Sequence, residues 1–151
     1  LLLSEPWGKN SLRVRATQRS EFIPDTDSAL LEPEDTEVQI TIEGKKAVIT
    51  NGKLTCKIMD NGVLQYYNQN GKLLLEEYDR TRDMYEGSDK FASALEIVPR
   101  TFNPRQCSDN FKLTVRFEAY KDEKIFGMGQ YQQPGKCSVC LVRQRVRYSV
   151  E

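Results

Sequence analysis

Three Asn-Gly pairs, placed nine or ten residues apart, constrain the fold of this chain more than any other feature. They are Asn51-Gly52, Asn61-Gly62 and Asn70-Gly71. Alternating apolar and polar residues flank them. For Asn51-Gly52 this pattern predicts a β-hairpin with a type I′ turn, because both central residues of that turn need a positive φ. Strands joined by such short loops are antiparallel neighbours, since a parallel connection needs a dozen or more residues. The sequence therefore predicts an antiparallel meander.

Alternation of apolar and polar residues continues on both sides of the meander. Further strands are predicted at residues 11–17, 37–43, 94–102, 111–120 and 124–128. Between strands, residues 20–35 are predicted to form a surface loop, and residues 79–90 a charged loop in which Asp79, Arg80, Arg82 and Asp83 make weak exposed ion pairs. About nine strands at hairpin spacing, with no helical period, predict an all-β antiparallel β-sandwich.

Composition excludes several classes of function. Lys and Arg number 22 and Asp and Glu number 22, so the chain has no basic excess for nucleic acid. No apolar run approaches the roughly 18 residues of a membrane span. The chain contains no histidine, which rules out Ser-His-Asp or Cys-His catalysis and His-ligated zinc within it. We expect no metal and no cofactor.

The four cysteines indicate reduced thiols rather than a disulfide framework or a zinc site. Cys56 alternates with Leu54 and Ile58, which predicts a buried strand residue. Cys137 and Cys140 form a CxxC without a second pair or a histidine, so we expect plain thiols in a tail. The expected location is cytoplasmic. The chain has no initiating Met, and a start within a longer product, with or without an upstream leader, is the interpretation that we favour.

Three segments resemble the N-terminal β-sandwich of glycoside hydrolase family 31, which includes α-glucosidases and α-xylosidases. Residues 4–17 (SEPWGKNSLRVRAT) resemble its opening strand, and residues 50–77 resemble its array of Asn-Gly hairpins. Residues 113–134 (LTVRFEAYKDEKIFGMGQYQQP) resemble its closing segment and are the most specific of the three. The resemblance covers residues 1–134.

Residues 135–151 depart from the family pattern. We interpret them as a divergent tail that arises from truncation or a frame shift. Arg143, Arg145 and Arg147 alternate there, and either a basic strand edge or a solvated tail fits this pattern.

The resemblance implies a galactose-mutarotase-like sandwich that packs on a catalytic (β/α)8 barrel. That barrel supplies the aspartate nucleophile and the aspartate acid/base of a retaining mechanism. A barrel needs about 200 residues or more, so no catalytic residue is assigned to this chain. The implied function is that of a non-catalytic N-terminal domain of a retaining α-glycosidase, inactive alone, whose partners are the barrel and, through it, an α-glycoside or oligosaccharide.

The resemblance also implies roles for a few residues. Gln130 and Tyr131 are the candidates for the substrate entrance, with a position at the domain boundary as the alternative. Gly127 and Gly129 are predicted to form a structural turn before them. Trp7 is the candidate for a domain interface rather than a sugar-stacking platform.

A stand-alone carbohydrate-binding module is the alternative function. Tyr66, Tyr67 and Tyr78 could supply aromatic faces for a sugar. Adjacent tyrosines on a strand point to opposite faces, however, so at most one of Tyr66 and Tyr67 belongs to any platform. For the same reason Glu76 and Glu77 cannot form a catalytic pair on one face. An independent enzyme is disfavoured, because no nucleophile and base can be paired.

Overall fold

The computed structural model describes residues 1–24, 30–108, 110–121, 123 and 147–150. These residues form ten strands and no helix, which confirms the all-β prediction. The strands are β1 (Leu2–Pro6), β2 (Leu12–Ala16), β3 (Val38–Glu43), β4 (Lys46–Asn51), β5 (Leu54–Ile58), β6 (Leu64–Asn68), β7 (Leu73–Glu76), β8 (Arg100–Pro104), β9 (Phe111–Arg116) and β10 (Arg147–Val150). Within these ranges no helix is long and apolar enough to cross a membrane.

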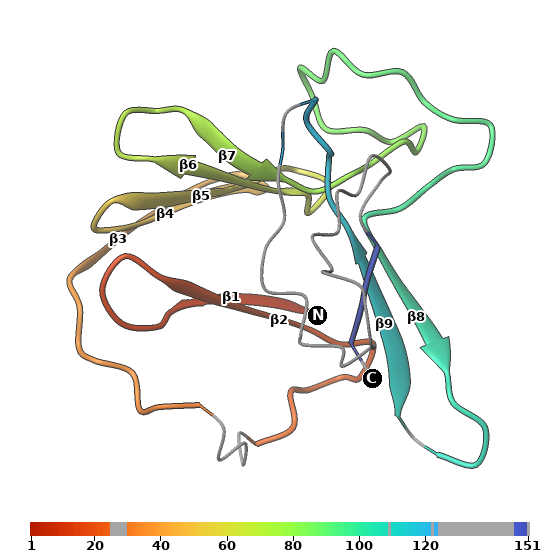
Figure 1. The fold of residues 1–151 in the computed structure, drawn as a ribbon, viewed down its shortest axis with the longest axis horizontal. Coiled ribbons are helices and arrows are strands. Elements are labelled where there is room, and N and C mark those ends of the chain that lie inside the picture. The colour runs from red at the N-terminus through yellow and green to blue at the C-terminus, as the bar shows by residue number, and fades with distance from the viewer. Residues whose placement is uncertain (25–29, 109, 122, 124–146, 151) are drawn as a thin grey trace, which may run out of the picture.

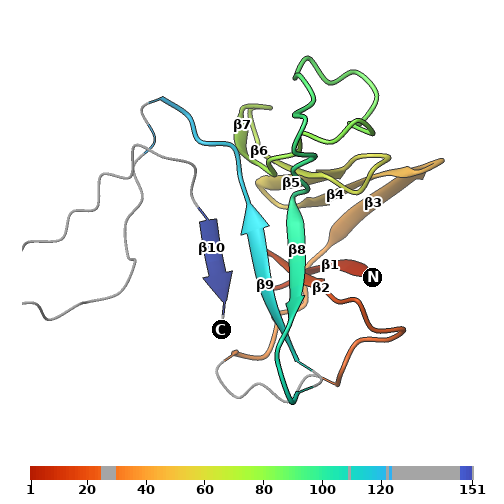
Figure 2. The same cartoon turned by 90° about the vertical axis from the view of Figure 1, so that its right-hand side faces the viewer.

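The strands form three antiparallel sheets. The largest has the order β3-β4-β5-β6-β7, which confirms the predicted meander. The β1–β2 hairpin lies along one face of this sheet (Figure 1). The third sheet has the order β10-β9-β8 and runs across the ends of the meander strands (Figure 2). β1 was not predicted because its sequence does not alternate. β10 pairs with β9, so Arg147 lies in a strand, whereas Arg143 and Arg145 lie outside the described residues.

The Asn51-Gly52 hairpin is present, but its turn lies one residue later than predicted. Asn51 pairs with Leu54, so Gly52 and Lys53 are the central turn residues. Gly52 has a φ of 58° and Lys53 does not have a positive φ, which is the pattern of a type II′ turn and not of type I′. The predicted turn type is therefore wrong, although the hairpin itself is confirmed.

Asn51 belongs to the strand because its side chain holds the β1–β2 turn. The side chain is 1% exposed, and its Nδ2 donates to the carbonyl oxygens of Gly8 and Ser11, each at 2.8 Å. In return, the backbone N–H of Lys53 donates to Asn10 Oδ1 at 2.7 Å. A Cβ at position 52 would collide with that same Asn10 oxygen. The turn around Trp7 is thus clasped onto the β4–β5 hairpin.

The hydrophobic core lies on one face of the meander and is small. Among the described residues the buried apolar side chains are Ile49, Cys56, Val63, Leu64 and Tyr78. Cys56 is 0% exposed, as predicted, and burial raises the pKa of its thiol to about 12, so the thiol stays protonated. Ile40 and Ile42 continue the same face on edge strand β3, yet they are 58% and 73% exposed.

Two sheets meet at a corner where β7 and β9 run on beyond their ends. The N–H of Tyr78 donates to Arg116 O, and the N–H of Glu118 donates to Glu76 O, both at 2.8 Å. Glu77 and Phe117 form an antiparallel bridge between these bonds. Two predicted strands differ from the observed ones. The strand predicted at residues 111–120 ends at Arg116 as β9, and the strand predicted at residues 94–102 begins only at Arg100 as β8. Residues 94–99 belong to the loop after β7.

Candidate functional site

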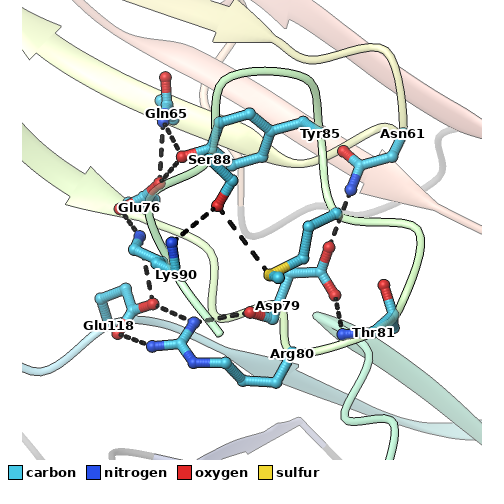
Figure 3. Close-up of polar contacts among 11 residues, drawn as sticks. Asn61, Gln65, Glu76, Asp79, Arg80, Thr81, Tyr85, Ser88, Lys90 and Glu118 are labelled. Atoms are coloured by element: carbon cyan, nitrogen blue, oxygen red, sulfur yellow. Dashed lines mark hydrogen bonds and ion pairs between the residues drawn. The ribbon is translucent and has the colours of Figure 1, made fainter. Parts of the chain in front are cut away.

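Among the described residues, a group of interacting charged side chains lies beside this corner (Figure 3). We call it the corner cluster. Its members come from β6, from the end of β7, from the loop at residues 79–99 and from the segment after β9. They are Gln65, Glu76, Arg80, Tyr85, Lys90 and Glu118.

Glu76 is the acceptor at the centre of the corner cluster. It is only 3% exposed. Gln65 Nε2 donates to its Oε1 at 2.8 Å, the Tyr85 hydroxyl donates to the same oxygen at 3.0 Å, and Lys90 Nζ donates to Oε2. Burial by itself would raise the pKa of Glu76, but the hydrogen bonds and the Lys90 charge outweigh it and hold the pKa below 4.5. Glu76 is therefore a fixed anion.

Lys90 and Arg80 fasten the loop to the segment after β9. Lys90 Nζ lies 3.2 Å from Glu118 Oε1, so it bridges two carboxylates. The Arg80 guanidinium donates to both oxygens of Glu118, at 2.6 and 3.1 Å. Burial would lower the pKa of Lys90, but Glu76 and Glu118 raise it overall. The corner cluster contains two cations and two anions, so its net charge is zero.

The predicted exposed charge run at residues 79–83 is wrong for its first two members. Asp79 is 4% exposed and accepts hydrogen bonds from Asn61 Nδ2 at 2.8 Å and from the N–H of Thr81 at 3.0 Å. The Arg80 side chain is 18% exposed. Arg82 and Asp83 are exposed, as predicted, and the Arg82 side chain, 82% exposed, pairs with that of Glu96, 48% exposed. Asp79 is buried and Arg80 is half-buried, and each has a partner from a distant segment, Asn61 for Asp79 and Glu118 for Arg80.

Glu77, the neighbour of Glu76, enters a separate ion pair. Arg100 Nε donates to its Oε1 at 2.8 Å, and the N–H of Leu64 donates to its Oε2 at 3.0 Å. A second Arg100 nitrogen contacts Oε2 as well. Burial raises the pKa of Glu77, and Arg100 offsets this only in part. The two glutamates thus have different partners.

This arrangement is suited to holding distant segments of the chain together. A general base or nucleophile needs a free lone pair that faces a substrate. Glu76, Glu77 and Glu118 each face a cation instead. In the described part of the chain, no group of His, Cys, Asp or Glu residues could hold a metal ion. The corner cluster holds the loop at residues 79–99 against the sheet.

Two open depressions lie between the β1–β2 hairpin and β8–β9. The larger has a volume of about 730 Å³ and the smaller about 170 Å³, and they share Ala16, Thr17 and Phe102. None of the described residues that line them is an aspartate or glutamate. A retaining glycosidase needs two carboxyl groups about 5 Å apart, so neither depression meets that requirement.

Of the residues predicted for the substrate entrance, its turn and the domain interface, only Trp7 lies in the described part. Gln130, Tyr131, Gly127 and Gly129 are outside the described residues. Trp7 is half-buried in the β1–β2 turn, and the Arg13 guanidinium carbon lies 4.5 Å from the centre of its ring. Its assignment to a domain interface stays a prediction.

Sequence reasoning missed the corner cluster because its pairs are distant in the chain. Lys90 lies 14 positions from Glu76, and Arg80 lies 38 from Glu118. The available signal was the run from Glu76 to Arg80, in which every residue except Tyr78 is charged and which follows the last hairpin of the meander. A strand that ends against the next sheet buries such residues, but the sequence does not show which cations approach them.

The described residues define an all-β domain of antiparallel sheets in which the buried glutamates Glu76 and Glu77 are paired with cations. No family model matches the chain. A curated protein of Pseudescherichia vulneris, "Uncharacterized family 31 glucosidase ORF2", is 42% identical over an alignment of 160 positions. The alignment covers 99% of this chain and 30% of that protein. The crystal structure of a GH31 α-xylosidase from a soil metagenome, complexed with xylose, matches with a TM-score of 0.77 and 45% identity over 88% of this chain and 20% of that one.

The chain is therefore a relative of the family 31 glycoside hydrolases, which confirms the resemblance found in its motifs. It spans less than a third of the length of the curated relative and a fifth of the solved enzyme.

Proposed function

We propose that this chain serves as a non-catalytic N-terminal domain of a retaining α-glycosidase of the α-xylosidase or α-glucosidase type. One observation carries the proposal. The similarity extends over nearly all of this chain but over only 20% to 30% of its relatives. The pairing of the buried carboxylates of the corner cluster with cations supports a structural role as well.

In this proposal the domain packs on a (β/α)8 barrel and lends a loop near Gln130 to the substrate entrance. The barrel supplies both catalytic carboxylates. The sandwich is of the galactose-mutarotase-like type, and its sugar contacts are limited to that loop. Planar amides and aromatic rings suit such contacts, since sugar hydroxyls need paired donors and acceptors and sugar C–H faces stack on rings.

A first experiment measures turnover of p-nitrophenyl α-xyloside by the purified chain. We expect none, because no aspartate or glutamate is among the described residues that line the two depressions. Measurable hydrolysis that copurifies with the chain would contradict the non-catalytic assignment.

A second experiment grafts this chain in place of the matching region of the soil-metagenome α-xylosidase. We expect a soluble, active chimera, since the two are 45% identical and share the fold. A chimera with the matching region of the P. vulneris protein is the control. If the control chimera were active and the chimera with this chain were inactive, the result would argue against packing of this chain on the barrel.

The same chimera tests whether the loop near Gln130 contributes to the substrate entrance. Gln130→Ala and Tyr131→Ala should raise KM for the xyloside, whereas Gln133→Ala, in the same segment, should leave it unchanged. Equal effects at all three positions would remove the assignment of Gln130 and Tyr131 to the substrate entrance.

The alternative of a carbohydrate-binding module has less support. Tyr78 is 7% exposed, and Lys57 Nζ covers the Tyr67 ring at 4.6 Å. Affinity electrophoresis in xyloglucan and starch separates the two functions, and retardation of the isolated chain would favour the binding module.

A further inference from the structure

We propose that Asn70 is a site of spontaneous deamidation, and that the fold protects Asn61 and Asn51 from the same reaction. Each of the three residues precedes a glycine, whose lack of a side chain leaves its backbone nitrogen open to approach. The local sequence therefore makes all three reactive. The structure makes them unequal.

The reaction needs only water. The Gly71 nitrogen attacks the side-chain carbonyl carbon of Asn70, and a C–N bond closes a five-membered succinimide. The bond from that carbon to Nδ2 breaks, and ammonia leaves with the proton of the Gly71 amide. Water then opens either C–N bond of the imide, which yields aspartate or isoaspartate at position 70. The balance is one asparagine and one water to one acid and one ammonia.

Asn70 has the freedom that this reaction requires. It lies in the β6–β7 turn and is exposed. Its backbone N–H donates to Asn68 Oδ1 at 2.9 Å, but its own carboxamide makes no hydrogen bond to any described residue. The side chain can therefore rotate towards Gly71. The Gly71 N–H donates to Asn68 O at 3.0 Å, so this one turn bond must open first.

Asn61 provides a matched comparison within the same chain. The Gly62 N–H donates to Met59 O at 2.9 Å, so the attacking nitrogen is engaged as it is at Gly71. The carboxamide, however, is held at both ends. Its Nδ2 donates to Asp79 Oδ2 at 2.8 Å and to Asp83 O at 3.1 Å, and its Oδ1 accepts from the N–H of Val63 at 3.2 Å. Succinimide formation at Asn61 requires the loss of these bonds as well.

Asn51 is held most firmly. Its Nδ2 donates to two backbone carbonyls, and the side chain is 1% exposed. Rotation of the carboxamide would release the β1–β2 turn and leave buried polar groups without partners. We therefore expect the order of reactivity Asn70, then Asn61, then Asn51.

The test is a time course of the intact folded chain in mildly alkaline buffer, followed by peptide mapping with mass spectrometry. We expect the Asn70 peptide to be modified at least about tenfold faster than the Asn61 peptide, which corresponds to ~1.4 kcal/mol of extra local opening. Isoaspartate should be the signature at position 70. Equal rates at Asn70 and Asn61 in the folded chain would overturn the proposal.

Two controls separate the fold from the local sequence. The same time course in concentrated urea should bring the three rates to within a few-fold of one another, whereas a tenfold ratio that persists in urea would assign the difference to sequence and overturn the proposal. In Asn70→Gln, which loses no side-chain bond, the main product should disappear while Asn61 stays slow. If Asn61 in this variant were modified as fast as Asn70 is in the unchanged chain, that result would also contradict the proposal.

Discussion

Glu76 and Glu77 are neighbours in the sequence, and both are 3% exposed, yet their pKa values shift in opposite directions. Glu76 has three side-chain donors from two segments, while Glu77 relies on one arginine and one backbone N–H. Equal exposure therefore does not mean equal electrostatics. At Glu76 the hydrogen bonds and the Lys90 charge outweigh burial, whereas at Glu77 burial, together with the nearby Asp79 charge, outweighs Arg100 and the N–H of Leu64.

The largest expected effect comes from removing the single cation of Glu77. Arg100→Met should leave a buried anion without its counter-ion and lower the free energy of unfolding by about 3–5 kcal/mol. Urea unfolding followed by circular dichroism measures this. The double variant Glu77→Gln with Arg100→Met should recover part of the loss. A double variant as unstable as the sum of the two single variants would show that the pair is not coupled.

Removal of Lys90 should cost less, because Gln65 and Tyr85 still donate to Glu76. We expect Lys90→Met to lower the free energy of unfolding by about 1–3 kcal/mol. It should also raise cleavage of the loop at residues 79–99 in limited proteolysis, since Lys90 holds that loop to Glu76 and Glu118. A loss as large as that of Arg100→Met would contradict the difference in partner number.

The pH dependence of stability should differ in sign between the two glutamates. The ordinary pKa of both carboxyls is 4.5. The folded-state pKa of Glu76 is lower, so its contribution is present above pH 4.5 and is lost as the pH falls through the folded-state pKa. The folded-state pKa of Glu77 is higher, so its contribution is complete below pH 4.5 and is lost as the pH rises towards the folded-state pKa.

Urea titrations at a series of pH values test this for two variants. Glu76→Gln should reduce the loss of stability on the acid side of pH 4.5, and Glu77→Gln should reduce the decline on the other side. If both variants changed the same side, the assigned directions would be wrong.

The smallest effect is expected at the exposed pair of Arg82 and Glu96. Their side chains are 82% and 48% exposed, so Arg82→Gln should change the free energy of unfolding by less than ~0.5 kcal/mol. This variant is also the control for Arg80→Gln, two positions away, which removes both hydrogen bonds to Glu118 and should cost clearly more.

The sequence predicted the parts of the fold that depend on near neighbours. Alternation and Asn-Gly pairs were sufficient for the meander and for the buried thiol of Cys56. They were not sufficient for the turn at Gly52, because Asn51 is drawn into the strand by carbonyls of Gly8 and Ser11, about 40 positions away. The same holds for the corner cluster, whose cations come from distant segments.

The apolar face of edge strand β3 is not wholly covered. Val38, Ile40 and Ile42 share one face of β3, as their spacing indicated, yet Ile42 is 73% exposed because β3 is an edge strand. Periodicity shows which side chains point the same way, and it does not show how far the neighbouring sheet extends. The residues assigned to the substrate entrance stay predictions.

The corner between β7 and β9 has a consequence for the order of folding. The meander closes through short hairpin loops, whereas the bonds from Tyr78 to Arg116 and from Glu118 to Glu76 span about 40 residues and have a larger loop-closure entropy. We therefore expect Glu76 and Glu77 to stay hydrated while the hairpins form, and to lose water only when β9 arrives. In pulsed hydrogen exchange during refolding, amides of β4 to β6 should gain protection before those of Tyr78 and Glu118, and simultaneous protection would disprove this order.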